Sequence, residues 1–256
     1  MTPEEYRFLY DLEGQHWWFV GMRKITAALL DPLLPSGPRR ILDAGCGTGF
    51  MLGWLKRYCD GRDLYGLDLS AEALHYCSQR RENLLVRGSV EDLPFPDRVF
   101  DVVISLNVLE YFSLPDAQRA ISEMGRVLKE GGLIFLRASA FQFLYSEHDR
   151  AISSVHRYTT KELKQCLMHQ GFKLERLTYA NSVLSPAAVV WRLLHRRSRR
   201  PPQSDVRPLP WGLRWANAWL ARTLMLEAAW LKHFPLPAGL SVIGIARKSC
   251  GGNQCV

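Results

Sequence analysis

The sequence predicts an α/β fold in which helices cover a doubly wound, mostly parallel sheet of seven strands. Between residues 40 and 138, short apolar segments alternate with segments that repeat apolar residues at helical spacing. The first apolar segment runs directly into a turn with glycine at every second position. Alternating strands and helices are typical of a parallel sheet with right-handed crossover connections. A chain of 256 residues can bury one large core of this kind, and nothing forces two domains.

The first strand and its glycine turn predict a ligand site. Residues 40–44 form the strand, and Gly45, Gly47 and Gly49 precede an apolar helical pattern. Glycine permits positive φ and close approach of a ligand, and the free N–H groups at a helix N-terminus favour anionic groups. Nineteen residues after Gly49, the second strand ends in Asp68, where a doubly wound fold places the acid that binds a ribose diol. The ligand is therefore predicted to be a nucleoside.

The remaining elements follow in order along the chain. Ser70 caps a helix, and Pro115 opens a second helix whose apolar residues recur at helical spacing. Thr160 caps a third helix, which ends at Gly171. A sixth strand follows this helix, and the last strand lies near the C-terminus. The predicted strands are residues 40–44, 63–68, 84–87, 99–105, 132–138, 172–179 and 240–247.

Two details separate this glycine turn from a dinucleotide-binding turn. The dinucleotide pattern requires glycine at its sixth position, which is Phe50 here. Asp43, at the end of the strand, suits an ammonium group better than a pyrophosphate. With an acidic residue before Gly-x-Gly-x-Gly, the sequence resembles the class I S-adenosylmethionine-dependent methyltransferases. Later segments resemble that family's adenine-binding stretch, its fourth strand and the turn into its fifth strand, at residues 87–95, 100–110 and 127–134.

The resemblance implies a Rossmann-like methyltransferase fold, S-adenosylmethionine as the cofactor, and an antiparallel last strand beside the fifth. The sequence departs from the family at three positions. Ser89 stands where an acid is usual, Asn107 where relatives commonly have aspartate, and Tyr111 where many have histidine. The cofactor-binding residues that we expect are Trp18, Arg23, Asp43, Gly45, Cys46, Gly47, Gly49, Asp68, Leu69, Ser89, Val90, Leu106 and Asn107.

The N-terminal residues 1–36 are predicted to form helices that precede the core. They include the adjacent aromatic residues Trp17, Trp18 and Phe19, followed by Arg23. One interpretation is a helix that packs its aromatic face on the domain. The other is a lid, in which Arg23 pairs with the methionyl carboxylate and an aromatic ring shields the sulfonium. The segment resembles the start of a group of bacterial methyltransferases that share His-Trp-Trp-Phe, and this resemblance extends over nearly the whole chain.

The predicted domain organisation has four parts. They are a helical lid at 1–36, a methyltransferase core at 37–179 and 240–248, a helical insertion at 180–239 that caps the acceptor site, and a disordered tail at 249–256. The insertion holds an apolar helix and then a second helix with a tryptophan stripe. Such a stripe usually packs in a core, and spacing alone does not separate that role from an acceptor-binding wall. The stripe consists of Trp211, Trp215, Trp219, Leu226 and Trp230.

Composition bounds the partners and the compartment. The formal net charge is +8, and much of the excess lies in residues 195–200. This run lacks interleaved aromatic residues, and the Asn/Asp-Pro-Pro-aromatic motif of base methylation is absent, so we expect no nucleic-acid partner. The apolar and basic stretch 186–200 leaves peripheral membrane contact open. Six cysteines show no metal-type pairing and no secretory signal is visible, so we expect a cytoplasmic protein without a metal site.

The expected chemistry depends on alignment and exclusion of water more than on reactive side chains, because a sulfonium methyl group is already activated. If the acceptor is a hydroxyl, a base must lie within about 3 Å of its proton. His148 and His156 follow the fifth strand, and Asp149 can orient either of them. These three are the candidate catalytic residues. The alternative is that they only hold their loop together.

The sequence leaves several functions open. The first hypothesis is an enzyme that methylates a small-molecule, saccharide or lipid-linked acceptor at oxygen. One rival is a cofactor-binding protein with a regulatory or interaction role, and another is an enzyme that uses the same pocket for non-methylating chemistry. A nicotinamide dehydrogenase is a further rival, which Phe50 and Asp43 oppose.

Overall fold

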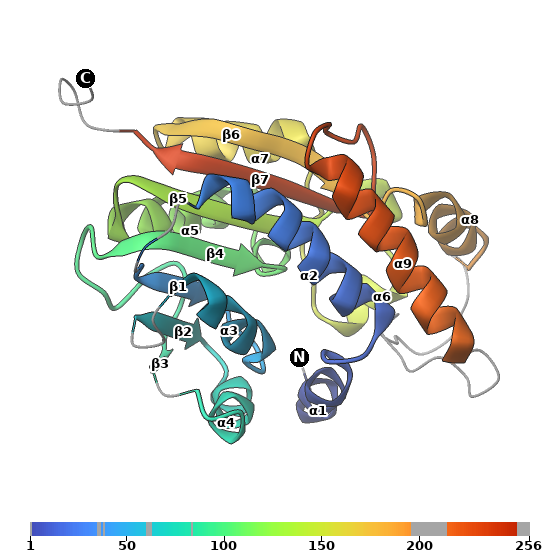
Figure 1. Ribbon diagram of the computed structural model, residues 1–256, viewed down its shortest axis with the longest axis horizontal. Coiled ribbons are helices and arrows are strands. Elements are labelled where there is room, and N and C mark those ends of the chain that lie inside the picture. Colours follow the sequence, from blue (N-terminus) through green and yellow to red (C-terminus); the bar gives the residue numbers. More distant parts are fainter. Residues whose placement is uncertain are drawn as a thin grey trace.

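The computed structural model contains one central sheet, and it describes residues 2–34, 37, 39–59, 63–82, 84–195 and 214–249. The strands of this part are β1 (Ile41–Ala44), β2 (Leu64–Asp68), β3 (Leu85–Arg87), β4 (Phe100–Leu106), β5 (Leu128–Ser139), β6 (Phe172–Ala180) and β7 (Ser241–Lys248). They form a seven-stranded sheet in the order β3-β2-β1-β4-β5-β7-β6 (Figure 1). β7 runs antiparallel to β5 and β6, and the other neighbours are parallel. The predicted doubly wound sheet is therefore confirmed.

β5 begins earlier than the predicted strand. Leu128 already pairs with Phe100 of β4, and a register shift then brings Leu133 opposite Val102. Gly131 lies in this irregular stretch, with a φ of 71°. The sequence pattern indicated a turn before the strand, whereas the structure accommodates the glycine inside the strand as a bulge does.

Two helices begin one residue before their predicted starts. α5 (Leu114–Val127) follows Ser113, and α7 (Thr160–His169) follows Thr159. The Thr159 hydroxyl accepts a hydrogen bond from the N–H of Glu162, whose carboxylate accepts one from the N–H of Thr159. This capping box explains why Thr159 and not Thr160 is the cap. The other α-helices of the described part are α1 (Pro3–Leu12), α2 (Trp17–Leu30), α3 (Phe50–Leu55), α4 (Ala71–Gln79), α6 (Glu147–Ala151), α8 (Ser185–His195) and α9 (Arg214–Leu231).

Each face of the sheet carries its own hydrophobic core. On one face, α5 and α7 pack through buried residues such as Ile121 and Leu163. On the other face, α2 and α9 contribute Ile25 and Leu224, which join Phe135 of β5 in one cluster. Figure 1 shows α2 and α9 in front of the sheet, with α5 and α7 behind it. Helices on both faces of a mostly parallel sheet leave its carboxyl edge as the place for a ligand.

The predicted insertion supplies part of this helical layer. α9 packs along α2 and buries Ala221, Leu224 and Leu231. Small alanines on this face allow the two helices to approach closely. The tryptophan stripe lies on the outside, where Trp215 and Trp219 are more than half exposed. The expectation that the stripe packs in a core is therefore wrong for its described members. Three predicted features lie outside the described residues, and these are Trp211, the basic residues 196–200 and the tail 250–256.

Candidate active site

A cavity of about 1310 Å³ lies at the carboxyl edge of the parallel strands. The segments that follow β1, β2, β3, β4 and β5 form one wall, and α1 with the start of α2 lies across it. Pockets for a single small molecule usually measure about 300–1,000 Å³. The cavity therefore has room for a cofactor and a second molecule together.

Backbone geometry explains the glycine turn. Gly45, Gly47 and Gly49 have φ values of 89°, 55° and 81°. A Cβ atom on Gly45 would lie 2.2 Å from Val108, and one on Gly49 would lie 2.8 Å from the sulfur of Cys77. Side chains are therefore excluded at both positions by sterics as well as by φ. Of the predicted residues in this turn, Gly45 and Cys46 line the cavity, whereas Gly47 and Gly49 do not. The latter two shape the turn instead.

Asp43 presents an unsatisfied carboxylate oxygen to the cavity. The residue is 1% exposed, and its Oδ2 accepts no hydrogen bond within the described part of the chain. Burial raises the pKa of Asp43 to about 7, with the nearby carboxyls of Asp68 and Glu13 adding to the shift. A buried polar atom without a partner is costly. A cationic donor such as the methionyl ammonium of S-adenosylmethionine would satisfy it, so the residues present fit this cofactor.

Asp68 lies beside Asp43 at the end of β2. Its Oδ2 accepts the N–H of Gly47 at 2.9 Å, and its Oδ1 accepts the N–H of Ser70 at 2.9 Å. Burial raises its pKa, although these hydrogen bonds oppose the shift. The carboxylate is thus held by the backbone at the cavity wall, as a ribose-binding acid requires. The predicted adenine-side residues also line the cavity, and these are Leu69, Ser89 and Val90.

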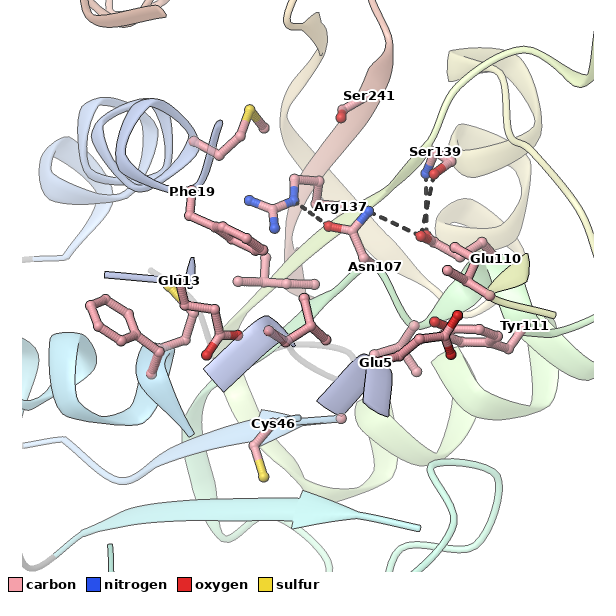
Figure 2. A pocket seen from close by; sticks show the side chains of 18 of the residues that line it. Glu5, Glu13, Phe19, Cys46, Asn107, Glu110, Tyr111, Arg137, Ser139 and Ser241 are labelled. Atoms are coloured by element: carbon pink, nitrogen blue, oxygen red, sulfur yellow. Dashed lines mark hydrogen bonds between the residues drawn. The ribbon is translucent and has the colours of Figure 1, made fainter. Parts of the chain in front are cut away.

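A hydrogen-bonded chain of side chains crosses the other half of the cavity (Figure 2). Arg137 donates from Nε to Asn107 Oδ1 at 2.8 Å, and Asn107 donates from Nδ2 to Glu110 Oε1 at 3.0 Å. Glu110 also accepts the N–H and the hydroxyl of Ser139. Asn107 has a φ of 59°, which turns the chain at the end of β4. Asn107 and Leu106 line the cavity, and their predicted contact with the cofactor stays a prediction.

Arg137 is the cationic residue among these hydrogen-bonded side chains. It is 6% exposed, and burial lowers its pKa to about 10, while Glu110 and Asp43 oppose the shift. Its guanidinium lies 5.2 Å from the ring centroid of Trp18. No described residue accepts a hydrogen bond from its Nη1 or Nη2. No sequence motif indicated Arg137. The one sign of it in the sequence was a charged residue inside an otherwise apolar strand.

Arg23 lines the cavity, but its guanidinium is bound to the segment between α1 and α2. Its guanidinium donates to the carbonyl oxygens of Glu13 and Gly14, and it stacks over the ring of Phe50 at 4.5 Å from the centroid. Trp18 lines the cavity as well. The pairing of Arg23 with a methionyl carboxylate stays a prediction.

Glu13 ties the end of α1 to the glycine turn, a role that no sequence motif indicated. Its carboxylate accepts a short hydrogen bond from the hydroxyl of Thr48 and lies 3.4 Å from Arg80. Arg80 also donates to the backbone carbonyls of Thr48 and Tyr10. Burial raises the pKa of Glu13 to about 7. The end of α1 is thereby held against the turn that follows β1.

The three candidate catalytic residues separate in the structure. His148 lines the cavity, whereas His156 and Asp149 do not. Nε2 of His156 lies 3.2 Å from Glu162 at the start of α7. Asp149 is fully buried and pairs with the Nε of Arg157 at 2.7 Å. The placement of His156 and Asp149 thus favours the alternative in which they hold the loop together, because both are committed to structural pairs.

Asn181 is a buried amide to which no sequence motif gave a role. It follows β6, lines the cavity and is 2% exposed. Its Oδ1 accepts no hydrogen bond from any described residue. Ser241 of β7 lines the same region. In the sequence, Asn181 and Ser241 lie at the two opposite ends of the insertion. They come together because β6 and β7 pair in the antiparallel direction.

Comparison with known proteins agrees with this geometry. Residues 42–136 match a family model described as "Methyltransferase domain". The chain is 34% identical over 119 residues to a fatty-acid O-methyltransferase of Mycolicibacterium smegmatis, covering 45% of this chain and 42% of that protein. It is 40% identical over 120 residues to a malonyl-[acyl-carrier protein] O-methyltransferase of Herminiimonas arsenicoxydans, covering 46% and 45%. The match thus spans less than half of either relative.

A solved structure agrees over a longer stretch. The crystal structure of a SAM-dependent methyltransferase from Archaeoglobus fulgidus aligns with a TM-score of 0.61 at 16% identity, covering 95% of this chain and 99% of that one. This likeness concerns the fold. Together with the sheet order, it shows that this chain has the class I S-adenosylmethionine-dependent methyltransferase fold, and residues 42–136 are similar to the methyltransferase domain family.

Proposed function

We propose that this chain transfers the methyl group of S-adenosylmethionine to an oxygen atom of a small-molecule, saccharide or lipid-linked acceptor. The observation that carries the proposal is the buried, unpartnered oxygen of Asp43 beside the glycine turn. It lies in a cavity large enough for a donor and an acceptor.

One half of the cavity would hold the cofactor. This donor half consists of Asp43, Gly45, Cys46, Asp68 and Ser89. Asp43 would accept a hydrogen bond from the methionyl ammonium, and Asp68 would accept those of the ribose hydroxyls. The bound cofactor supplies an activated methyl group on a positively charged sulfur. The protein's contribution is then to align donor and acceptor and to exclude water.

The other half would hold the acceptor. This acceptor half consists of Glu110, Arg137, Ser139 and Ser241. We also assign Asn107 to it, in place of the cofactor contact expected from the sequence. The lid at 1–36 would close over both halves, and the insertion at 180–239 would wall the acceptor half through Asn181 and Ala188, which line the cavity. Aromatic and aliphatic side chains surround these polar groups, which suits an acceptor with an apolar body. These are Trp17, Trp18, Phe19, Met22, Phe112 and Ile152.

Oxygen is the proposed acceptor atom because two relatives are named for O-methylation, one of them on fatty acids. In the transfer, an oxygen lone pair forms the new O–C bond while the S–C bond breaks, and its electrons stay on sulfur. A carboxylate oxygen needs no base for this step, because it carries no proton. A hydroxyl acceptor must lose its proton, and His148 is the candidate that lines the cavity.

The test is incubation of the full chain with methyl-labelled S-adenosylmethionine and a panel of acceptors. The panel contains a fatty acid, a malonyl thioester of acyl carrier protein, a long-chain alcohol, a lipid-linked saccharide and a long-chain amine. We expect label on an oxygen of at least one panel member, and none with Asp43→Asn. Arg119→Leu, on the surface of α5, is the matched control.

The rival functions predict different results. Tight binding of the cofactor without methyl release to any acceptor would favour a regulatory or interaction role. Conversion of an acceptor without incorporation of label would favour non-methylating chemistry. Label found only on the amine would contradict the choice of oxygen while leaving methyl transfer in place.

A further inference from the structure

α9 has two apolar faces, of which the inner one is buried against the rest of the fold. The inner face packs on α2 through Ala221, Leu224, Ala228 and Leu231. The outer face is exposed, with Trp215 at 66%, Trp219 at 63%, Leu226 at 74% and Trp230 at 55%. Spacings of four and seven residues place these side chains on one stripe of a helix. Phe234, 57% exposed, continues the stripe beyond the helix, and we call these five residues the aromatic face.

The described charged residues on the outside of α9 and directly after it are positive. Arg222 lies on the same stripe, with its guanidinium 5.7 Å from the ring centroid of Trp219, and Lys232 is exposed just after the helix. The one acidic residue of α9 is Glu227, which is 4% exposed. It points inward, where it accepts hydrogen bonds from the backbone N–H groups of residues 181, 182 and 183. The outer surface of α9 is therefore aromatic and cationic without a carboxylate.

The sequence that precedes α9 is also positively charged. Residues 192–214 contain seven arginines and one acidic residue, Asp205. Tryptophan side chains favour the boundary between water and hydrocarbon, where the ring is buried and the indole N–H stays solvated. Helices that combine such residues with arginine and lysine lie in the plane of anionic bilayers.

We propose that the aromatic face of α9 docks the protein onto the surface of an anionic lipid bilayer. No helix in the described part of the chain is long and apolar enough to cross a membrane, so the contact is peripheral. A second copy of the chain fits the face less well. A two-fold dimer through α9 would bring Arg222 and Lys232 of both copies together, and like charges in an interface disfavour association.

The position of α9 connects this surface to the cavity. The Oδ1 of Asn217 accepts the N–H of Trp17 at 2.8 Å, and its Nδ2 donates to the carbonyl of Gln15 at 2.9 Å. Trp17 begins α2 and lines the cavity. Figure 1 shows α9 lying along α2, with α8 on its other side. A protein docked through α9 would therefore hold its cavity close to the bilayer. The docking itself does not depend on methyl transfer, so it can be tested without an acceptor.

The experiment is co-sedimentation of the full chain with vesicles of phosphatidylcholine alone or of phosphatidylcholine mixed with phosphatidylglycerol. We expect binding to the mixed vesicles that is at least about tenfold stronger than to the neutral ones and that weakens as salt is added. The triple variant Trp215→Ser, Trp219→Ser, Trp230→Ser should lose at least about tenfold in affinity for the mixed vesicles. Arg222→Glu should weaken binding to the mixed vesicles and leave the neutral ones unchanged.

The matched control removes exposed apolar side chains elsewhere. Val155 and Met168 are 53% and 54% exposed, and neither belongs to α9. The double variant Val155→Ser, Met168→Ser should sediment like the unmodified chain. Melting temperature and S-adenosylhomocysteine affinity, measured for each variant, verify that the fold is intact.

Three results would overturn the proposal. They are equal sedimentation of the unmodified chain and a folded triple variant, absence of binding to mixed vesicles, and equal loss in the control variant. A dimer in analytical ultracentrifugation that the triple variant converts to a monomer, without vesicle binding, would assign the aromatic face to a second copy instead.

Discussion

The donor half and the acceptor half of the cavity are built in different ways. The donor half comes from consecutive segments, in which a strand, a glycine turn and the end of the next strand place Asp43, Gly45 and Asp68 together. The acceptor half gathers residues that follow β4 with residues of β5 and of β7, and β7 is far from the other two in sequence. A local motif therefore reveals the donor half, whereas only the packed sheet reveals the acceptor half. If this division is right, substitutions in one half should leave the other half's ligand unaffected.

The largest effect is expected from Asp43→Asn. The change removes the buried negative charge that would face the methionyl ammonium, and truncating one partner of such a pair costs about 2–5 kcal/mol. Affinity for S-adenosylhomocysteine should fall by about 100-fold or more, as measured by calorimetry. The melting temperature of the ligand-free protein should not fall, since the variant no longer buries a carboxylate. Unchanged affinity would show that the ammonium binds elsewhere.

A comparable effect on rate is expected from His148→Ala with a hydroxyl acceptor. Loss of a general base usually lowers the rate by about 100-fold to 10,000-fold. With a carboxylate acceptor the single-turnover rate should stay the same, because no proton has to be removed. His156→Ala is the control, and it should leave the rate unchanged with either acceptor, since His156 lies outside the cavity lining. Full activity of His148→Ala on a hydroxyl acceptor would dismiss this residue as a base.

Arg137 gives the sharpest test of the division itself. In Arg137→Leu the acceptor half loses its cation, so the KM of an acceptor that binds the guanidinium should rise by about tenfold or more. Arg137→Lys should recover little of this, because lysine lacks the two parallel donors of the guanidinium. The Kd of S-adenosylhomocysteine should stay within about twofold for both variants. A large change in that Kd with a normal acceptor KM would place Arg137 in the donor half.

A smaller effect is expected from pH. The pKa of Asp43 is raised to about 7 in the free protein, and a bound cation favours the ionised carboxylate and so lowers this pKa. Cofactor affinity should therefore weaken as pH falls below about 7, by up to about tenfold per unit, and level off above it. Calorimetry across this range checks the expectation. Glu13→Gln should keep this pH dependence of cofactor affinity, and Asp43→Asn should lose it. Both variants are needed because the pKa of Glu13 is also raised to about 7.

The smallest effect concerns two glycines of the same turn. Gly45→Ala combines a φ of 89° with a Cβ atom 2.2 Å from Val108. Gly47→Ala has a φ of 55°, and nothing lies within 4 Å of its Cβ position. The strain at position 45 should cost about 1–3 kcal/mol, which lowers the melting temperature by about 2–4 °C per kcal/mol in a chain of this size. Equal melting temperatures in a thermal scan would contradict this account of the turn.

By itself, the sequence determined the alternating strands and helices and the glycine turn beside Asp43 and Asp68, because periodic apolar residues and a glycine turn act over short stretches of chain. The antiparallel last strand was expected only from the family resemblance. The sequence also offered His148 and His156 as candidate bases that Asp149 could orient, beside the alternative that the three only hold their loop together. Spacing along a loop does not tell which side chain faces a cavity.

Tertiary structure alone decided the rest. A single arginine in an apolar strand became the cation of the acceptor half, because β4 and β5 place Arg137 within reach of Asn107 and Glu110. The tryptophan stripe became a surface, because α2 takes the opposite, alanine-containing face of α9. In both cases the helical or strand pattern was visible in advance. Which side of the helix or strand contacts protein, and which contacts solvent, depends on elements that are distant in the sequence.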